Sequence, residues 1–311
     1  MFNKFIEELN EKNIKISFFN GKMHYKGTEQ YLNEELISKL KINRAKLLKH
    51  FWPKECPNML PVNTEGDLTP LILLHAGEYF GISEYLHNKH PFYGLFYVGS
   101  ETEKIRHKSV EAFADEYLRQ LLNILPQGPY YLGGMSFGGI VAYEMAIRLV
   151  NMGHEVPLLI LGDCGLISYE PPLSYPDLYK KLYHKCYELL RNIYKVSVYT
   201  RQKLKYELFP SFYFGLSIGE RFKYMVMRWT EMMQKYKPTT EFNGEILLFR
   251  ASENKFNSEY LGWERVCKNI TLVPFKGYHG SLFDEENESV SVIKTSIKDK
   301  LKEIENYKIG P

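Results

Sequence analysis

The stretch PQGPYYLGGMSFGGIVAYEMA, residues 126–146, places Ser136 between two glycines, Gly134 and Gly138. The apolar segment before it predicts a strand, and the amphipathic segment after it predicts a helix. The five central residues match G-x-S-x-G, in which a strained turn lifts a serine hydroxyl above a sheet. Residues two before and two after such a serine approach each other closely, so both must be small. The alternative is a glycine-rich turn that only happens to include a serine.

A serine hydroxyl needs a base before it can attack a carbonyl. His279, in PFKGYHGSLFD, follows the last predicted strand and precedes the last predicted helix. Such a loop is where catalytic groups collect in parallel sheets, although a histidine there could also serve only structure. Because a helix begins at the serine, its first free N–H groups point to the site. We therefore expect the N–H of Phe137 to donate to an oxyanion.

Two carboxylates could orient the histidine and stabilise its charged form. Asp163 ends the strand pattern VPLLILGD, and Glu253 follows the next strand pattern, GEILLFRAS. We expect Asp163, because a charge that ends a buried run needs a partner. The alternative for Asp163 is a structural role as a helix N-cap.

Strand and helix patterns alternate from residue 69 onward, which predicts a parallel sheet covered on both faces. Residues 53–68, PKECPNMLPVNTEGDL, are rich in Pro and Asn and predict a linker. The chain of 311 residues has a net charge of +3, so no general attraction to nucleic acid is expected. The polar N-terminus and the lack of a long apolar run predict a cytoplasmic protein without membrane spans. Four widely spaced cysteines predict reduced thiols and no metal site: Cys56, Cys164, Cys186 and Cys267.

The segment SVEAFADEYLRQLLNILPQGPYYLGGMSFGGIVAYEMA closely resembles the thioesterase domains of nonribosomal peptide and polyketide synthases. The resemblance covers about residues 69–305 and implies an α/β-hydrolase fold over 69–311, with a mostly parallel sheet and a helical lid at about 170–240. It implies a second oxyanion amide from Ala76 or Gly77, in HAGEYFG, where the family usually has H-P-x-G-G. Asp163 lies where chain-terminating members carry their acid. Proofreading members usually carry it after the following strand.

Residues 1–52 predict a small α/β domain with a β-hairpin around Asn20 and Gly21. This order of elements resembles the TubC-type docking domains of synthases. The segment holds ten Lys and Arg against six Glu and no Asp, a charge near +4. A basic domain with a free hairpin edge suits capture of an acidic peptide tail. The expected docking residues flank the hairpin: Lys15, Lys22 and Lys26. The alternative is an N-terminal extension without a partner.

Together, the resemblances imply a thioesterase that releases an acyl, peptidyl or polyketide chain from the phosphopantetheine thioester of a carrier protein. An acyl-Ser136 intermediate would be resolved by hydrolysis or macrocyclisation, without a metal or cofactor of the enzyme's own. The implied partners are that carrier protein and the C-terminal tail of an upstream synthase subunit. The alternatives are a proofreading (type II-like) thioesterase, a lipase-like esterase and a docking protein with an inactive elbow.

Overall fold

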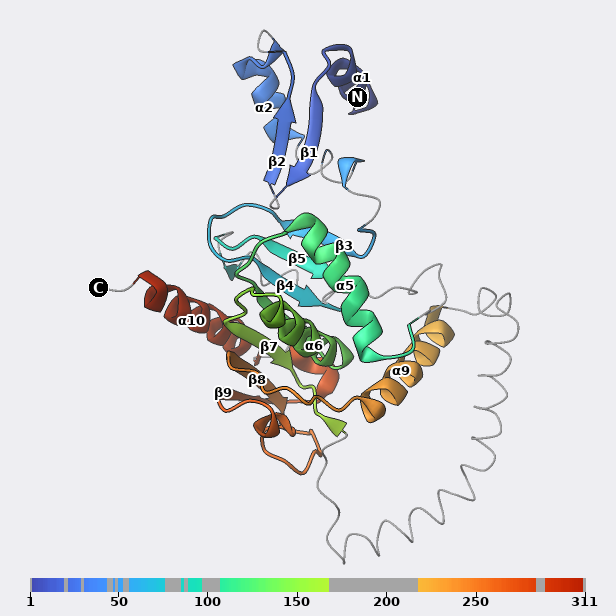
Figure 1. Ribbon diagram of the computed structural model, residues 1–311, viewed down its shortest axis with the longest axis vertical. Helices are drawn as coiled ribbons and strands as arrows, with labels where there is room; N and C mark the ends of the chain where they lie inside the picture. The colour runs from blue at the N-terminus through green and yellow to red at the C-terminus, as the bar shows by residue number, and fades with distance from the viewer. Residues whose placement is uncertain are drawn as a thin grey trace, which may run out of the picture.

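The computed structural model describes residues 2–19, 22–28, 31–43, 47, 50–52, 56–75, 85–86, 89–96, 107–167, 218–283 and 289–309. Within these ranges the chain forms a two-stranded sheet near the N-terminus and a seven-stranded sheet in the body (Figure 1). Most of the predicted lid, the turn at 20–21, and residues Ala76, Gly77 and Cys186 lie outside the described residues. Across those described ranges, no helix is both long and apolar enough to span a bilayer.

The central sheet has the strand order β3-β5-β4-β6-β7-β8-β9. From β4 to β9 neighbouring strands run parallel, and only β3 is antiparallel, pairing with β5 at the edge. The chain places β5 on one side of β4 and then β6 on the other. In open sheets, ligands bind at the carboxyl ends of the strands where the order reverses in this way. The strands are β3 (Met59–Asn63), β4 (Leu71–Leu74), β5 (Phe92–Leu95), β6 (Tyr131–Met135), β7 (Leu158–Gly162), β8 (Glu245–Ala251) and β9 (Ile270–Phe275).

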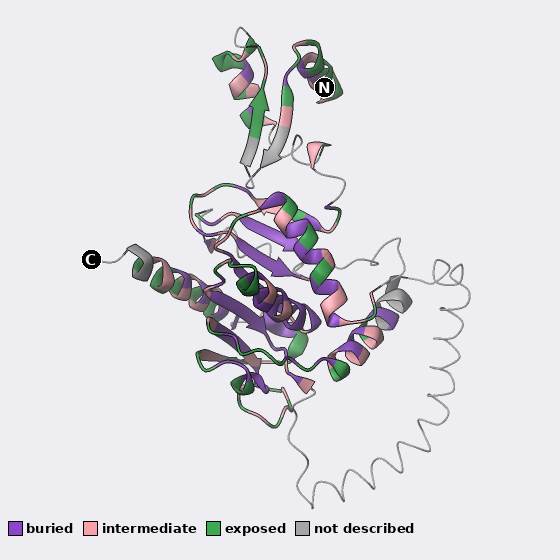
Figure 2. Cartoon of the chain, viewed as in Figure 1, coloured by how far each residue is buried: buried purple, intermediate pink, exposed green. Residues whose placement is uncertain are grey.

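Helices cover both faces of this sheet, as the alternating strand and helix patterns predict (Figure 1). The helices α5 (Val110–Ile124), α6 (Phe137–Asn151) and α9 (Ile218–Lys235) share one apolar core with alternate strand residues. The helix α10 (Ser289–Ile309) packs with the other set of strand residues, including Leu71. The strands β4 to β8 are therefore buried on both sides, which explains their nearly continuous apolar sequences (Figure 2).

The N-terminal segment has a small core of its own, separate from those of the body. Its elements are α1 (Phe2–Glu11), β1 (Lys15–Phe19), β2 (Lys22–Lys26) and α2 (Glu34–Ile42). The two strands are antiparallel with Lys15 opposite Lys26, so the predicted hairpin pairing is confirmed. The core side chains are Phe5, Leu9, Ile14, Leu36, Leu40 and Leu47.

The predicted linker, 53–68, contains a strand that the sequence pattern did not indicate. Residues 59–63 form β3, and Met59 is fully buried against the main core. Pro61 lies within this strand, which is possible because an edge strand has one side free of ladder hydrogen bonds. The boundary of the body therefore lies earlier than residue 69.

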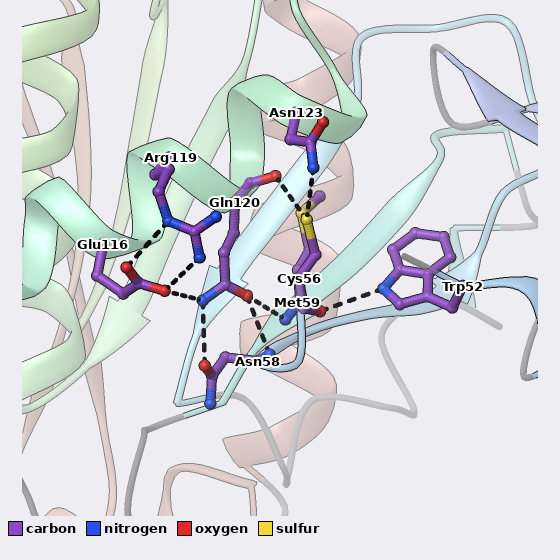
Figure 3. Close-up of polar contacts among 8 residues, drawn as sticks. All are labelled: Trp52, Cys56, Asn58, Met59, Glu116, Arg119, Gln120 and Asn123. Atoms are coloured by element: carbon purple, nitrogen blue, oxygen red, sulfur yellow. Dashed lines mark hydrogen bonds and ion pairs between the residues drawn. The ribbon is translucent and has the colours of Figure 1, made fainter. Parts of the chain in front are cut away.

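A buried amide fastens the start of this strand to α5 (Figure 3). The Oε1 atom of Gln120 accepts hydrogen bonds from the backbone N–H groups of Asn58 and Met59, at 3.0 and 3.2 Å. Its Nε2 donates to Asn58 Oδ1 at 3.0 Å and to Glu116 Oε1 at 2.8 Å. The Cys56 thiol donates to the Gln120 carbonyl oxygen at 3.6 Å. We call these contacts between residues 56–59 and α5 the clasp.

Candidate active site

The turn between β6 and α6 has the geometry that its glycines predict. Ser136 has φ 53° and ψ −126°, a backbone conformation that costs a non-glycine residue about 1–3 kcal/mol. A Cβ on Gly134 would lie 2.5 Å from the carbonyl carbon of Gly138. A Cβ on Gly138 would lie 2.8 Å from the carbonyl oxygen of Leu74. Only glycine therefore fits at both positions, at Gly134 because of the turn itself and at Gly138 because of the end of β4.

The other two predicted residues lie at the same edge of the sheet. Met135 pairs with Gly162, so Ser136 and Asp163 directly follow paired residues of adjacent strands, which are about 4.8 Å apart. The N–H of Ser136 donates to the Gly162 carbonyl oxygen at 3.0 Å. His279 begins a short 3₁₀ helix (His279–Phe283) after β9.

Asp163 is the carboxylate that contacts the histidine. Its Oδ2 atom lies 2.8 Å from Nδ1 of His279. The aspartate side chain is 1% exposed, whereas the histidine side chain is 48% exposed. The histidine is therefore held by a buried anion on one side and is open to solvent on the other, as a proton-transferring residue needs to be.

The Asp163 carboxylate stays ionised despite its burial. Burial alone would raise its pKa, because a charged group loses its hydration. The hydrogen bonds from His279, from the N–H of Ala251 at 2.9 Å and from Nδ2 of Asn254 at 2.7 Å outweigh that effect. The net result is a pKa below the usual value for aspartate.

The predicted oxyanion donor of α6 sits in an aromatic cluster. Phe137 is the first residue of α6, so its N–H has no acceptor within the helix. Its ring is buried and stacks on Trp229 of α9, with ring centres 5.4 Å apart and planes within 6°. This stack connects α9, which lies in the C-terminal part of the predicted lid, to the residue that follows the serine.

A second histidine lies beside the serine turn but cannot act as the base. His75 follows β4 with φ 57°, and its ring is 5.1 Å from that of Trp229. Its Nε2 atom is 3.1 Å from the hydroxyl of Tyr117. Burial lowers the pKa of His75 to about 3, so the ring is too weakly basic to take a proton from a serine hydroxyl. The expected second oxyanion residues, Ala76 and Gly77, follow it and lie outside the described residues.

Sequence reasoning did not single out Asn254, His75 or Trp229. Asn254 lies 91 positions from the aspartate that it contacts, and Trp229 contacts Phe137 of α6 and His75 just after β4. Patterns within a segment carry no signal for such contacts. The one available hint for Asn254 was a polar residue just beyond a buried strand.

Comparisons with known proteins bear on this geometry. Residues 70–167 match the family model described as "Thioesterase domain". The match is to thioesterases. The matched thioesterase segment runs from the residue before β4 to just beyond Asp163, so it includes the serine turn and leaves out His279.

The curated relatives are large synthases. The chain is 38% identical over 110 residues to malpibaldin synthetase of Mortierella alpina, which covers 34% of this chain and 2% of that protein. It is 36% identical over 124 residues to a dimodular nonribosomal peptide synthase of Bacillus subtilis (strain 168), covering 38% of this chain and 5% of that protein. The chain thus spans a small fraction of the length of these relatives.

Solved thioesterase domains share the fold. The NocB thioesterase domain from the nocardicin cluster superposes with a TM-score of 0.54 at 24% identity, covering 75% of this chain and 94% of that one. The Vlm2 thioesterase domain bound with a dodecadepsipeptide gives 0.52 at 16% identity, covering 78% and 98%. The body therefore has the α/β-hydrolase fold that was expected.

Proposed function

We propose that this protein releases an acyl, peptidyl or polyketide chain from the phosphopantetheine thioester of a carrier protein, through an acyl-Ser136 intermediate. The observation that carries the proposal is the strained Ser136 at the carboxyl edge of the sheet that also holds the His279–Asp163 pair. The similarity to synthases and to thioesterase domains supports the choice of a carrier-bound thioester as substrate.

In the proposed reaction, His279 takes the proton of Ser136 as the serine oxygen attacks the thioester carbonyl. The N–H of Phe137 and an amide of Ala76 or Gly77 stabilise the oxyanion. The carbon–sulfur bond breaks, and the thiol leaves with the proton that His279 returns. Water, or an amine or hydroxyl of the bound chain, then attacks the acyl-serine with His279 again as base. Hydrolysis gives an acid, and internal attack gives a ring.

The position of the acid favours chain termination over proofreading. The histidine's partner is Asp163, which follows β7, and not Glu253, which follows β8. The family resemblance associates the first position with chain-terminating thioesterases. A lipase-like esterase would use the same triad, so the substrate class has to be measured.

The N-terminal segment would recruit the enzyme to the acidic C-terminal tail of an upstream synthase subunit. Lys15 and Lys26 are exposed and lie opposite each other on the hairpin, where an acidic strand could align with both. Lys22 lies on the same hairpin, and its side chain is outside the described residues.

Intact-protein mass spectrometry with an acyl-loaded carrier protein tests the chemistry. We expect an acylated enzyme that disappears in Ser136→Ala, together with a turnover loss of about 10⁴-fold or more. Faster turnover of free esters than of the carrier thioester would instead favour the esterase. The released product distinguishes hydrolysis from cyclisation.

Kinetics of the full chain tests recruitment. We expect the combined substitutions Lys15→Glu, Lys22→Glu and Lys26→Glu to slow turnover of the carrier subunit at low concentration. They should leave turnover of a small thioester unchanged. The difference should shrink as salt rises, because exposed charges are screened. An equal loss on both substrates would contradict a docking role. A matched control makes the same charge changes at exposed positions of the body: Lys108, Lys237 and Lys302.

A further inference from the structure

The buried aspartate of the site is held by an amide from the neighbouring loop. Nδ2 of Asn254 donates to Oδ1 of Asp163 at 2.7 Å, while Oδ2 faces His279 at 2.8 Å. The orientation of this amide is fixed, because Oδ1 of Asn254 accepts from the N–H of Phe256 at 2.9 Å. Its nitrogen must therefore point toward the aspartate.

The loop that carries this amide is itself fastened by one guanidinium group. Arg250 of β8 donates through Nη1 to the carbonyl oxygens of Ser258 and Glu259, at 2.7 and 2.6 Å. Through Nη2 it donates to the carbonyl oxygen of Phe256 at 2.9 Å. A charged group with several backbone acceptors restricts a loop more than neutral contacts do. The position of Asn254 is thus set from β8.

We propose that Asn254 is a positioning residue, which holds the Asp163 carboxylate in the orientation that presents Oδ2 to His279. Two donors on Oδ1, this amide and the N–H of Ala251, prevent the carboxylate from rotating. The proposal rests on the proposed function, because the orientation matters only if His279 transfers protons. Asn254 does not touch the reacting atoms.

The variant Asn254→Asp keeps the shape of the side chain but replaces the N–H donor to Asp163 by a carboxylate oxygen. Asn254→Asp would place a carboxylate oxygen where the amide nitrogen lies 2.7 Å from Asp163 Oδ1. Two carboxylates so close cannot both ionise freely, and one pKa of the pair rises strongly. When the pair shares a proton, an O–H donor replaces the lost N–H donor. When both are ionised, they repel and Asp163 turns away from His279.

Other ionisable groups also lie around this pair. His279 faces Asp163 from the 3₁₀ helix, and Arg250 lies behind the loop on β8. Cys164 follows Asp163 directly, and its burial raises the pKa of its thiol, so it stays protonated. The new pair is therefore the group that Asn254→Asp adds to the pH profile. The rate of this variant relative to wild type should rise as pH falls.

The test measures kcat and KM for a thioester between pH 5.5 and 8.5 in the full chain. We expect Asn254→Ala to lower kcat by about 10–100-fold, with little change in KM, at a ratio to wild type that is flat with pH. We expect Asn254→Asp to be at least as slow at pH 8.5 and to recover several-fold toward pH 5.5. Glu253→Gln, an exposed neighbour on the same loop, should behave as wild type.

The downfield proton resonance of the His279 Nδ1–H group gives a readout that does not depend on turnover. We expect it in wild type, weakened in Asn254→Ala, and pH-dependent in Asn254→Asp. Wild-type kcat and an unchanged resonance in Asn254→Ala would overturn the proposal, as would parallel pH profiles for all variants. If Ser136→Ala matches wild type in turnover, the proposed function fails, and the resonance alone decides the role of Asn254.

Discussion

Replacing Asp163 by asparagine tests the site most directly, because the structure fixes how the new amide must lie. Oδ1 of Asp163 faces two donors, the N–H of Ala251 and Nδ2 of Asn254. An amide nitrogen there would meet two other N–H groups, so the asparagine oxygen must take that side. Its NH₂ group must then face Nδ1 of His279, where a proton acceptor was before.

The consequence is that His279 adopts its other neutral tautomer. To accept from the new NH₂ group, Nδ1 must lose its proton, which moves to Nε2 and blocks the atom that should act as base. We expect Asp163→Asn to lower kcat about 10³–10⁴-fold, a loss of about 4–5.5 kcal/mol of transition-state stabilisation.

Steady-state hydrolysis of a small thioester measures this loss, and circular dichroism checks that the fold is retained. Glu253→Gln is the matched control, because it removes the other carboxylate that follows a strand at this edge of the sheet. A variant Asp163→Asn with more than a tenth of wild-type kcat would refute the reasoning. So would a larger loss in Glu253→Gln, which would move the acid to the loop after β8.

Three further variants test the surroundings of the site. Gly134→Ala puts a methyl group 2.5 Å from the Gly138 carbonyl carbon, and thermal melting should show a loss of about 1–3 kcal/mol together with lost activity; an unchanged melting curve would contradict the turn geometry. Gln120→Met leaves the N–H groups of Asn58 and Met59 without their acceptor, and urea unfolding should show a loss of about 2–4 kcal/mol, whereas Gln234→Met on an exposed face of α9 should change little. Trp229→Leu removes the stack on Phe137 and should lower kcat roughly 10-fold or more, with normal acyl-carrier binding; wild-type kcat would show that the stack does not support the oxyanion donor.

The serine turn can be predicted well from the sequence, because most of its requirements are local. Gly134 is needed by a contact within five residues, and the strand and helix beside the serine follow from hydrophobic periodicity, whereas Gly138 is needed by its contact with the distant Leu74 carbonyl oxygen. The placement of His279 and Asp163 was also predictable, since both lie within a few residues of the carboxyl ends of parallel strands, and these ends must share an edge.

Contacts between distant segments were not predictable in the same way. The edge strand β3 lies in the stretch that reads as linker, because Pro61 and the Pro and Asn residues around it outweigh the short apolar run MLPV in any local pattern. Asn254 has no signal in a local pattern for a different reason, since its role depends on the orientation of a side chain 91 positions away. Such roles arise from packing, and a single sequence does not record which partners meet.

The clasp on α5 determines where this chain could be cut and rejoined to other modules. A recombination junction on the N-terminal side of Cys56 would carry β3 and its hydrogen bonds along with the body. A junction drawn at residue 69, where the composition changes, would strip β3 away and leave the backbone of β5 unpaired along the edge of the sheet. Unpaired edges invite strand exchange with other molecules, so the resulting fusion would tend to aggregate. Exchange of the N-terminal unit would therefore succeed only when the crossover leaves Gln120 its partners.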